Sequence, residues 1–108
     1  MRTLIAVCMI LFTATTFADT SNVVVFIKDF AFVPAVVKIK PGQTIEWINK
    51  DDEPHAVVAN DKAYRSLTLD TGDKFARQYP SAGEYEYFCS LHPHMTGKII
   101  VEPPTSTR

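Results

Sequence analysis

This sequence of 108 residues has little of what identifies several large classes of protein. Four glycines and seven prolines, with no repeat or linker between them, argue against a low-complexity chain and favour one domain. The formal net charge is only −1, from 11 basic and 12 acidic residues, which argues against a nucleic-acid binder held by phosphate contacts. No apolar run reaches the roughly 20 residues of a membrane span. Two cysteines are present, and their number suggests a single disulfide.

The N-terminus has the pattern of a secretory signal peptide. Arg2 precedes an apolar run over residues 4–12, and small residues follow as far as Ala18. A buried strand or helix is the alternative, but the run lacks the polar periodicity of an exposed face. We therefore predict that residues 1–18 are removed on export to the periplasm, and that residues 19–108 form the mature domain, with no membrane span.

Cleavage would leave only one cysteine in the mature chain and so exclude a disulfide within it. Cys8 lies in the segment to be removed, so Cys89 is left without an intrachain partner. A single thiol in an exported protein pairs with another molecule, is buried as an inert side chain, or binds a metal. The methionine count falls in the same way from three to one, Met95.

The remainder of the chain has the alternation of short β-strands. The β-branched run at residues 22–28 is typical of a buried strand, and Pro41-Gly42 is typical of a turn. Residues 30–34 are expected to form a bend, and residues 61–72 either one helical turn or a meandering loop. We expect strands over residues 22–28, 36–40, 44–49, 55–59, 74–79, 84–89 and 97–102. About seven to eight short strands predict an all-β sandwich.

Residues able to bind a metal are concentrated in one short segment. Cys-Ser-Leu-His-Pro-His-Met contains Cys89, His92, His94 and Met95, and His55 lies apart, after an acidic loop. Taken singly, each has an ordinary structural explanation: a buried thiol, a core-filling methionine, a surface histidine. Together, the only Cys and Met of the mature chain beside two of its three histidines favour a metal site.

The donor types favour copper over zinc. One thiolate, two imidazoles and a weak thioether make the His₂Cys set with a long axial Met that is found in blue-copper sites. Zinc prefers four strong tetrahedral ligands and does not use Met. The sequence thus predicts one copper ion held by His55, Cys89, His92 and Met95, with His55 coming from a separate strand.

These residues resemble a known family, the cupredoxins. The segment from Cys89 to Met95, followed by Thr-Gly-Lys-Ile-Ile-Val, is similar to their C-terminal copper loop, and its short Cys-x-x-His-x-x-Met spacing is most similar to the amicyanin type. Residues 41–49, 53–55 and 82–89 extend the resemblance over nearly all of the mature chain. The resemblance implies a Greek-key sandwich with a type 1 copper site. In that site, His55, Cys89 and His92 would be the equatorial ligands and Met95 would be the axial ligand. The resemblance also implies a periplasmic one-electron carrier.

Two positions depart from the family pattern. Ala56 stands where many relatives have Asn, which leaves only its backbone N–H to reach the Cys89 sulfur. Leu91 stands where amicyanin-like loops often carry Pro, so it keeps an N–H that Pro lacks. We predict a hydrogen bond to the sulfur from each of these two N–H groups.

The same loop is expected to meet redox partners. His92 should be partly exposed as the electron exit, within an apolar patch of Pro54, Pro93, Leu91 and Met95 where a partner docks transiently. The acidic residues 51–53 either steer a basic partner or form a solvated turn. His94 is expected on the exposed rim of the loop, and the protein is expected to be a monomer.

Three classes of function compete for this site. The first is a one-electron carrier without substrate chemistry, and the second is a periplasmic copper chaperone or store using the same ligands. The third, an enzyme of the multicopper or nitrite-reductase type, needs further histidine clusters. Three histidines cannot supply them, so we predict that the protein is not an enzyme.

Overall fold

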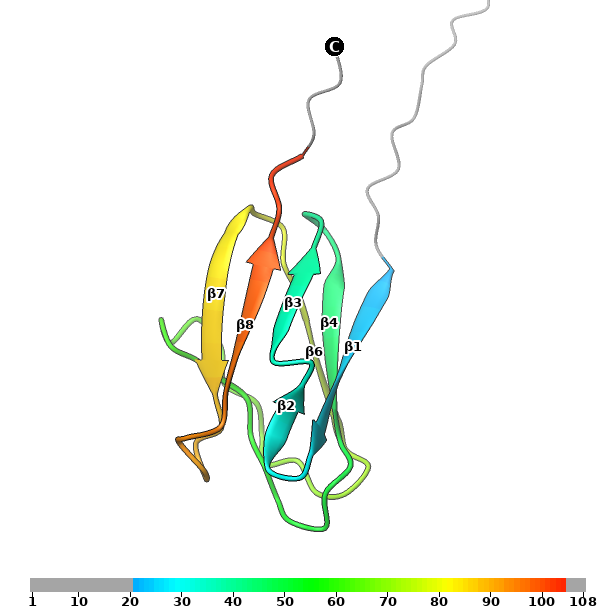
Figure 1. The fold of residues 1–108 in the computed structure, drawn as a ribbon, viewed down its shortest axis with the longest axis vertical. Helices are drawn as coiled ribbons and strands as arrows, with labels where there is room; N and C mark the ends of the chain where they lie inside the picture. The colour runs from blue at the N-terminus through cyan, green and yellow to red at the C-terminus, as the bar shows by residue number, and fades with distance from the viewer. Residues whose placement is uncertain (1–20, 105–108) are drawn as a thin grey trace, which may run out of the picture.

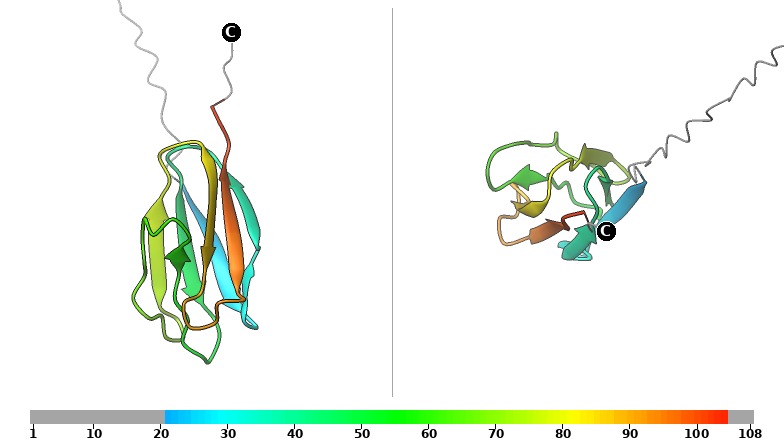
Figure 2. Two further views of the ribbon diagram at one scale, coloured as in Figure 1. Left: turned by 90° about the vertical axis from the view of Figure 1, so that its left-hand side faces the viewer. Right: turned by 90° about the horizontal axis from the view of Figure 1, so that it is seen from above.

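The computed structural model describes residues 21–104, and the predicted signal peptide at residues 1–18 lies outside them. Within this range the chain forms eight strands and no helix. The strands are β1 (Asn22–Lys28), β2 (Ala31–Val33), β3 (Val36–Ile39), β4 (Thr44–Asn49), β5 (Val58–Ala59), β6 (Lys74–Gln78), β7 (Gly83–Phe88) and β8 (Thr96–Val101). They form two four-stranded sheets packed against each other (Figure 1, Figure 2), so the predicted all-β sandwich is confirmed.

The chain passes repeatedly between the two sheets. The first sheet has the order β2-β1-β4-β6 and the second has the order β3-β8-β7-β5. The pairs β1–β4 and β3–β8 are parallel, whereas the other neighbours are antiparallel. Every connection from β2 to β7 changes sheet, which is the Greek-key manner of building a sandwich. Residues 21–104 hold no helix long and apolar enough to cross a membrane.

The core forms where alternate side chains of both sheets point inward. In β4, Ile45, Trp47 and Asn49 are buried, as their spacing predicts. The Trp47 ring is fully buried, with its centroid 5.3 Å from that of Tyr87 on β7 and 5.6 Å from that of Phe75 on β6. The contact with Tyr87 joins the two sheets, whereas the contact with Phe75 lies within the first sheet.

A glycine in β8 makes room for one of these rings. Gly97 is the register partner of Tyr87, and a Cβ placed on Gly97 would collide with the Tyr87 ring. The aromatic side chain therefore occupies the space over the glycine of the neighbouring strand, as in other sheets where a ring covers a glycine. No residue with a side chain fits there unless the buried ring moves.

The structure corrects the expectations for β1 and for the bend after it. β1 is buried on one face only, since Val24 and Phe26 are 37% and 41% exposed. The expected bend at residues 30–34 contains β2, which pairs with β1 through a tight turn at Asp29 and Phe30. Both turn residues have positive φ, 53° and 57°, which the Asp-Phe pair does not predict because such hairpin turns favour Asn-Gly.

The segment between β5 and β6 is a loop and contains no helical turn. It is fastened to the body by two isolated bridges, His55–Leu69 and Val58–Arg65. Of the strand expected at residues 55–59, only Val58 and Ala59 belong to β5. The bridge at His55 nevertheless ties the backbone of that residue to Leu69.

Candidate metal centre

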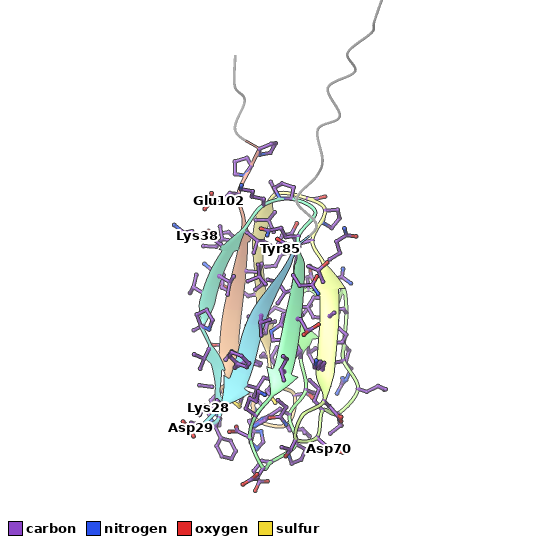
Figure 3. The ribbon with its side chains drawn as sticks, turned by 90° about the vertical axis from the view of Figure 1, so that its right-hand side faces the viewer. Lys28, Asp29, Lys38, Asp70, Tyr85 and Glu102 are labelled. Atoms are coloured by element: carbon purple, nitrogen blue, oxygen red, sulfur yellow. The ribbon has the colours of Figure 1, made fainter. Side chains whose placement is uncertain are left out.

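Three connections meet at one end of the sandwich. They are the turn between β1 and β2, the loop after β4, and the loop between β7 and β8 (Figure 1). In Figure 3, Asp29 and Asp70 lie at this end, whereas Lys38 and Glu102 lie at the other. Residues far apart in the sequence are thereby brought to a common site.

His55 is held by the loop that follows β4. It is fully buried, and its backbone exchanges two hydrogen bonds with Leu69, of 3.0 and 2.7 Å. Asn49, also fully buried, donates from its amide nitrogen to the carbonyls of Glu53 and Leu69 and accepts from the N–H of Asp51. This side chain therefore replaces regular strand pairing where the chain turns towards His55.

Cys89 and Met95 close a tight loop between β7 and β8. The N–H of Cys89 donates to the carbonyl of Met95 at 3.1 Å, and the N–H of Met95 donates to that of His92 at 2.9 Å. The side chains of Cys89 and Met95 are buried in the core, whereas His92 is half-buried. Backbone hydrogen bonds within seven residues thus fix the loop that carries three of the expected ligands.

Three of the four expected ligands converge. One donor atom each from His55, Cys89 and His92 lie within 4.8 Å of one another. The Cys89 sulfur is 3.7 Å from Nδ1 of His55 and 3.8 Å from Nδ1 of His92. Met95 belongs to the same buried cluster as Cys89, but His94 is exposed and lies outside the donor group, as expected for a residue on the rim. A thiolate between two imidazole nitrogens suits copper.

One of the two predicted hydrogen bonds to the sulfur is present. The N–H of Ala56 donates to Cys89 Sγ at 3.3 Å, so a backbone group makes this contact without the Asn side chain. Among the hydrogen bonds of residues 21–104, the one expected from Leu91 does not occur. The N–H of the next residue, His92, turns back to the Cys89 carbonyl instead, at 3.3 Å.

Asp51 is a residue of the site whose role the sequence does not reveal. Its Oδ2 lies 2.8 Å from Nε2 of His55, so the carboxylate orients the imidazole with Nδ1 towards Cys89. Burial alone would raise the pKa of Asp51, but hydrogen bonds from the backbone of Phe30 and Asp29 and from His55 outweigh it and lower that pKa. The carboxylate is therefore held ionised. The only sign of this role in the sequence is that Asp51 lies four residues before His55.

Three of the four residues expected in the apolar patch beside His92 are exposed, and the fourth is not. Leu91 is 48% exposed, and Pro54 and Pro93 are also exposed. Met95 is only 2% exposed, so it belongs to the core and contributes nothing to this surface. Phe30, which the sequence did not place here, is 45% exposed and has its ring 5.0 Å from the His92 ring.

Comparisons with known proteins agree with this geometry. The family model of the cupredoxin-like domain matches residues 1–101. Amicyanin from Paracoccus versutus is 36% identical over 85 residues, covering 74% of this chain and 64% of that protein, so this chain spans less than two thirds of that relative. Plastocyanin from Nostoc punctiforme is 35% identical over 91 residues, covering 67% of this chain and 65% of that protein.

Solved structures agree as well. The crystal structure of amicyanin from Paracoccus versutus has a TM-score of 0.69 at 37% identity, covering 82% of this chain and 87% of that one. A purple cupredoxin from Nitrosopumilus maritimus has the same TM-score at 28% identity, covering 78% of this chain and all of that one. The matches agree with the two-sheet sandwich and with the convergence of His55, Cys89 and His92 at one end of it. The chain therefore belongs to the cupredoxin family and is amicyanin-like.

Proposed function

We propose that this chain is a periplasmic type 1 (blue) copper protein that carries single electrons between redox partners. The observation that carries the proposal is the convergence of one donor atom each from His55, Cys89 and His92 within 4.8 Å at the end of the sandwich, with the sulfur 3.7 and 3.8 Å from the two Nδ1 atoms. Copper, the cofactor of cupredoxins, supplies a one-electron couple between Cu(II) and Cu(I) when bound. The chain itself performs no substrate chemistry.

The residues divide the work of holding the metal. His55, Cys89 and His92 are the strong ligands. Met95 is the weak fourth ligand, and its burial in the same cluster as Cys89 supports this role. Rigid backbone anchoring of His55 and Cys89 keeps the donor atoms in one arrangement for both oxidation states. A ligand set that need not move exchanges electrons with little reorganisation.

His92 is the ligand through which an electron leaves. It is half-buried, whereas His55 and Cys89 are fully buried, so it alone of the three reaches the surface. Around it, exposed Leu91, Pro93 and Pro54 offer a small apolar contact suited to a transient partner. The exposed acids Asp52 and Glu53 beside this contact would steer a basic partner towards it.

Export and a monomeric state complete the proposal. Residues 1–18 direct the chain to the periplasm, and residues 19–108 remain after cleavage. The Cys89 thiol is fully buried, which prevents it from pairing with a second molecule. This supports a monomer whose only described thiol is reserved for the metal.

A copper chaperone or store is the alternative, and the burial of the site disfavours it. A chaperone passes its ion on by ligand exchange, which requires a partner to reach the donor atoms. Here His55 and Cys89 have no exposed surface. A site of this kind retains its metal and exchanges electrons instead.

The deciding experiment is an absorption and EPR spectrum of the copper-loaded mature protein. We expect an intense visible thiolate-to-Cu(II) band that is lost and regained on reduction and reoxidation. Cys89→Ser should abolish the band, while His94→Ala, a control from the exposed rim of the same loop, should retain it. A colourless protein that binds only Cu(I) would support the chaperone, and an unchanged band in Cys89→Ser would overturn the site.

A further inference from the structure

The turn between β1 and β2 lies against the metal centre and carries an aromatic side chain over it. The centroid of the Phe30 ring is 5.4 Å from that of His55 and 5.0 Å from that of His92. Both contacts are edge-to-face, with interplanar angles of 84° and 86°, a favoured arrangement of aromatic rings. One exposed residue thus touches both ligand histidines without belonging to the donor group.

Phe30 occupies a backbone conformation that a bulky residue rarely adopts. Its φ is 57°, in the left-handed region where glycine and asparagine are common and where an aromatic residue is an outlier. A hairpin that needed only a tight turn would be better served by Asn-Gly. Strained residues of this kind gather at functional sites, and this one places its ring on the two imidazoles.

Asp51 holds this turn in place. Its carboxylate accepts the N–H of Asp29 at 2.6 Å and that of Phe30 at 3.0 Å, in addition to its contact with Nε2 of His55. The same side chain that orients His55 therefore fixes the backbone from which the Phe30 ring extends. The turn, His55 and the ring form one connected unit.

His92 lacks the polar support that His55 has. Within the described part of the chain no group forms a hydrogen bond with Nε2 of His92, whereas His55 Nε2 is bound to Asp51. Its ring is instead bordered by the rings of Phe30, His55 and His94, the last at 6.5 Å. Phe30 and His55 are the close contacts, so packing takes the place of a hydrogen bond.

We propose that Phe30 is a positioning residue for the ligand histidines. Its ring holds His92 with Nδ1 towards Cys89 before the metal binds, and it shields that imidazole from water and from competing chelators. This inference depends on the proposed function in one respect, namely that the bound metal is copper. A positioned His92 makes the metal-free site ready for copper and slows its release.

The test compares three variants with the unaltered protein. Phe30→Gly removes the ring and relieves the backbone, because glycine adopts φ near 57° without strain, so the fold is preserved. Phe30→Tyr keeps the ring and should behave as the unaltered protein does. Phe26→Ala is the matched control, since Phe26 is 41% exposed on β1 and has no ring contact with either histidine.

Two measurements are made on each protein. In the metal-free state, ¹³C relaxation of the His92 imidazole should show a mobile ring in Phe30→Gly and a restrained ring in the others. In the copper-loaded state, release of Cu(I) to bathocuproine disulfonate should be about three- to tenfold faster in Phe30→Gly, as expected from the loss of edge-to-face ring contacts. Phe26→Ala should stay within about twofold of the unaltered protein, the spread expected of a neutral surface change.

The outcomes separate this inference from the proposed function. Equal His92 motion in Phe30→Gly and in the unaltered protein, or a release rate no faster than that of Phe26→Ala, overturns the positioning role. The relaxation measurement needs no copper, so it decides the inference even if the visible band of the proposed function is absent. A normal visible band in the unaltered protein with no effect of Phe30→Gly leaves the carrier intact and removes only this inference.

Discussion

At the scale of single residues, the second imidazole nitrogen of His55 determines how the first one is presented. Nδ1 faces the Cys89 sulfur because Nε2 is bound to the Asp51 carboxylate at 2.8 Å. Carboxylates that hold the far nitrogen of a ligand histidine fix its tautomer and increase its basicity. Asp51 adds a second task, since it also accepts two backbone N–H groups of the neighbouring turn.

Replacing Asp51 by Asn should weaken copper binding. One amide oxygen cannot accept from His55 and from both N–H groups of the turn, so we expect the affinity to fall about tenfold to a hundredfold. Competition between the protein and a chelator of known affinity measures the change. The control is Asp52→Asn, which removes the same charge from the next, exposed position and should leave the affinity unchanged. Equal affinities for the two variants would contradict the role of Asp51.

The convergence of His55, Cys89 and His92 could be predicted from residue types, but the residues that support them could not. A lone Cys and Met beside two histidines carry chemistry that is visible in the sequence, and His55 was the remaining histidine. Asp51 was expected either to steer partners or to be a solvated turn residue. Its actual partners, the turn between β1 and β2 and the His55 ring, are brought to it only by the fold. Asn49 was placed inward by alternation, yet only the fold shows that its amide satisfies two carbonyls.

At the scale of strands, period-two alternation was sufficient where one face of a strand is buried. β3 buries Val37 and Ile39, and in β7 Tyr87 is buried whereas Glu86 is exposed. β2 escaped prediction because it has three residues and follows a turn with no glycine. Its position next to β1 depends on Asp51, a contact over more than twenty residues that no local pattern encodes.

The pairing of β7 with β8 should be sensitive to one methyl group. Gly97→Ala brings a Cβ into the Tyr87 ring, which is fully buried and cannot move aside freely. We expect the free energy of unfolding to fall by about 1–3 kcal/mol, the usual cost of overpacking. Denaturant titration of the metal-free protein measures it, with the exposed neighbour Thr96→Ala as the control, expected within about 0.5 kcal/mol. A stability of Gly97→Ala equal to that of the control would count against the packing described.

At the scale of the whole molecule, the converging donor atoms of His55, Cys89 and His92 lie at one end of the sandwich (Figure 1). His92, Leu91, Pro93 and Pro54 come from two loops that the strands bring together there. The sequence predicted an apolar patch of Pro54, Pro93, Leu91 and Met95. Met95 was placed in it wrongly, because its side chain is buried in the core. Phe30 joins the patch because the unexpected β1–β2 hairpin ends at the same place.

A charge placed in this patch should slow electron exchange between two copies of the protein. In self-exchange both molecules present the same surface, so Leu91→Glu brings like charges together, and we expect the rate to fall about tenfold. NMR line broadening in mixtures of oxidised and reduced protein measures this rate. Val24→Glu, on the outer face of β1 and 37% exposed, introduces the same charge elsewhere and should have a much smaller effect. Similar losses in both variants would exclude the patch as the contact surface.

The arrangement of the strand ends also determines which end of the sandwich faces outward when the protein is fused to a second protein or fixed to a surface. β1 begins and β8 ends at the end of the sandwich opposite the loops that carry His55 and His92 (Figure 1, Figure 2). A tether or a second protein joined before β1 or after β8 therefore starts on the side remote from the candidate metal centre. Mounted on an electrode by either route, the molecule would present its copper end outward, whereas an electrode coated with short alkyl chains would bind that end directly.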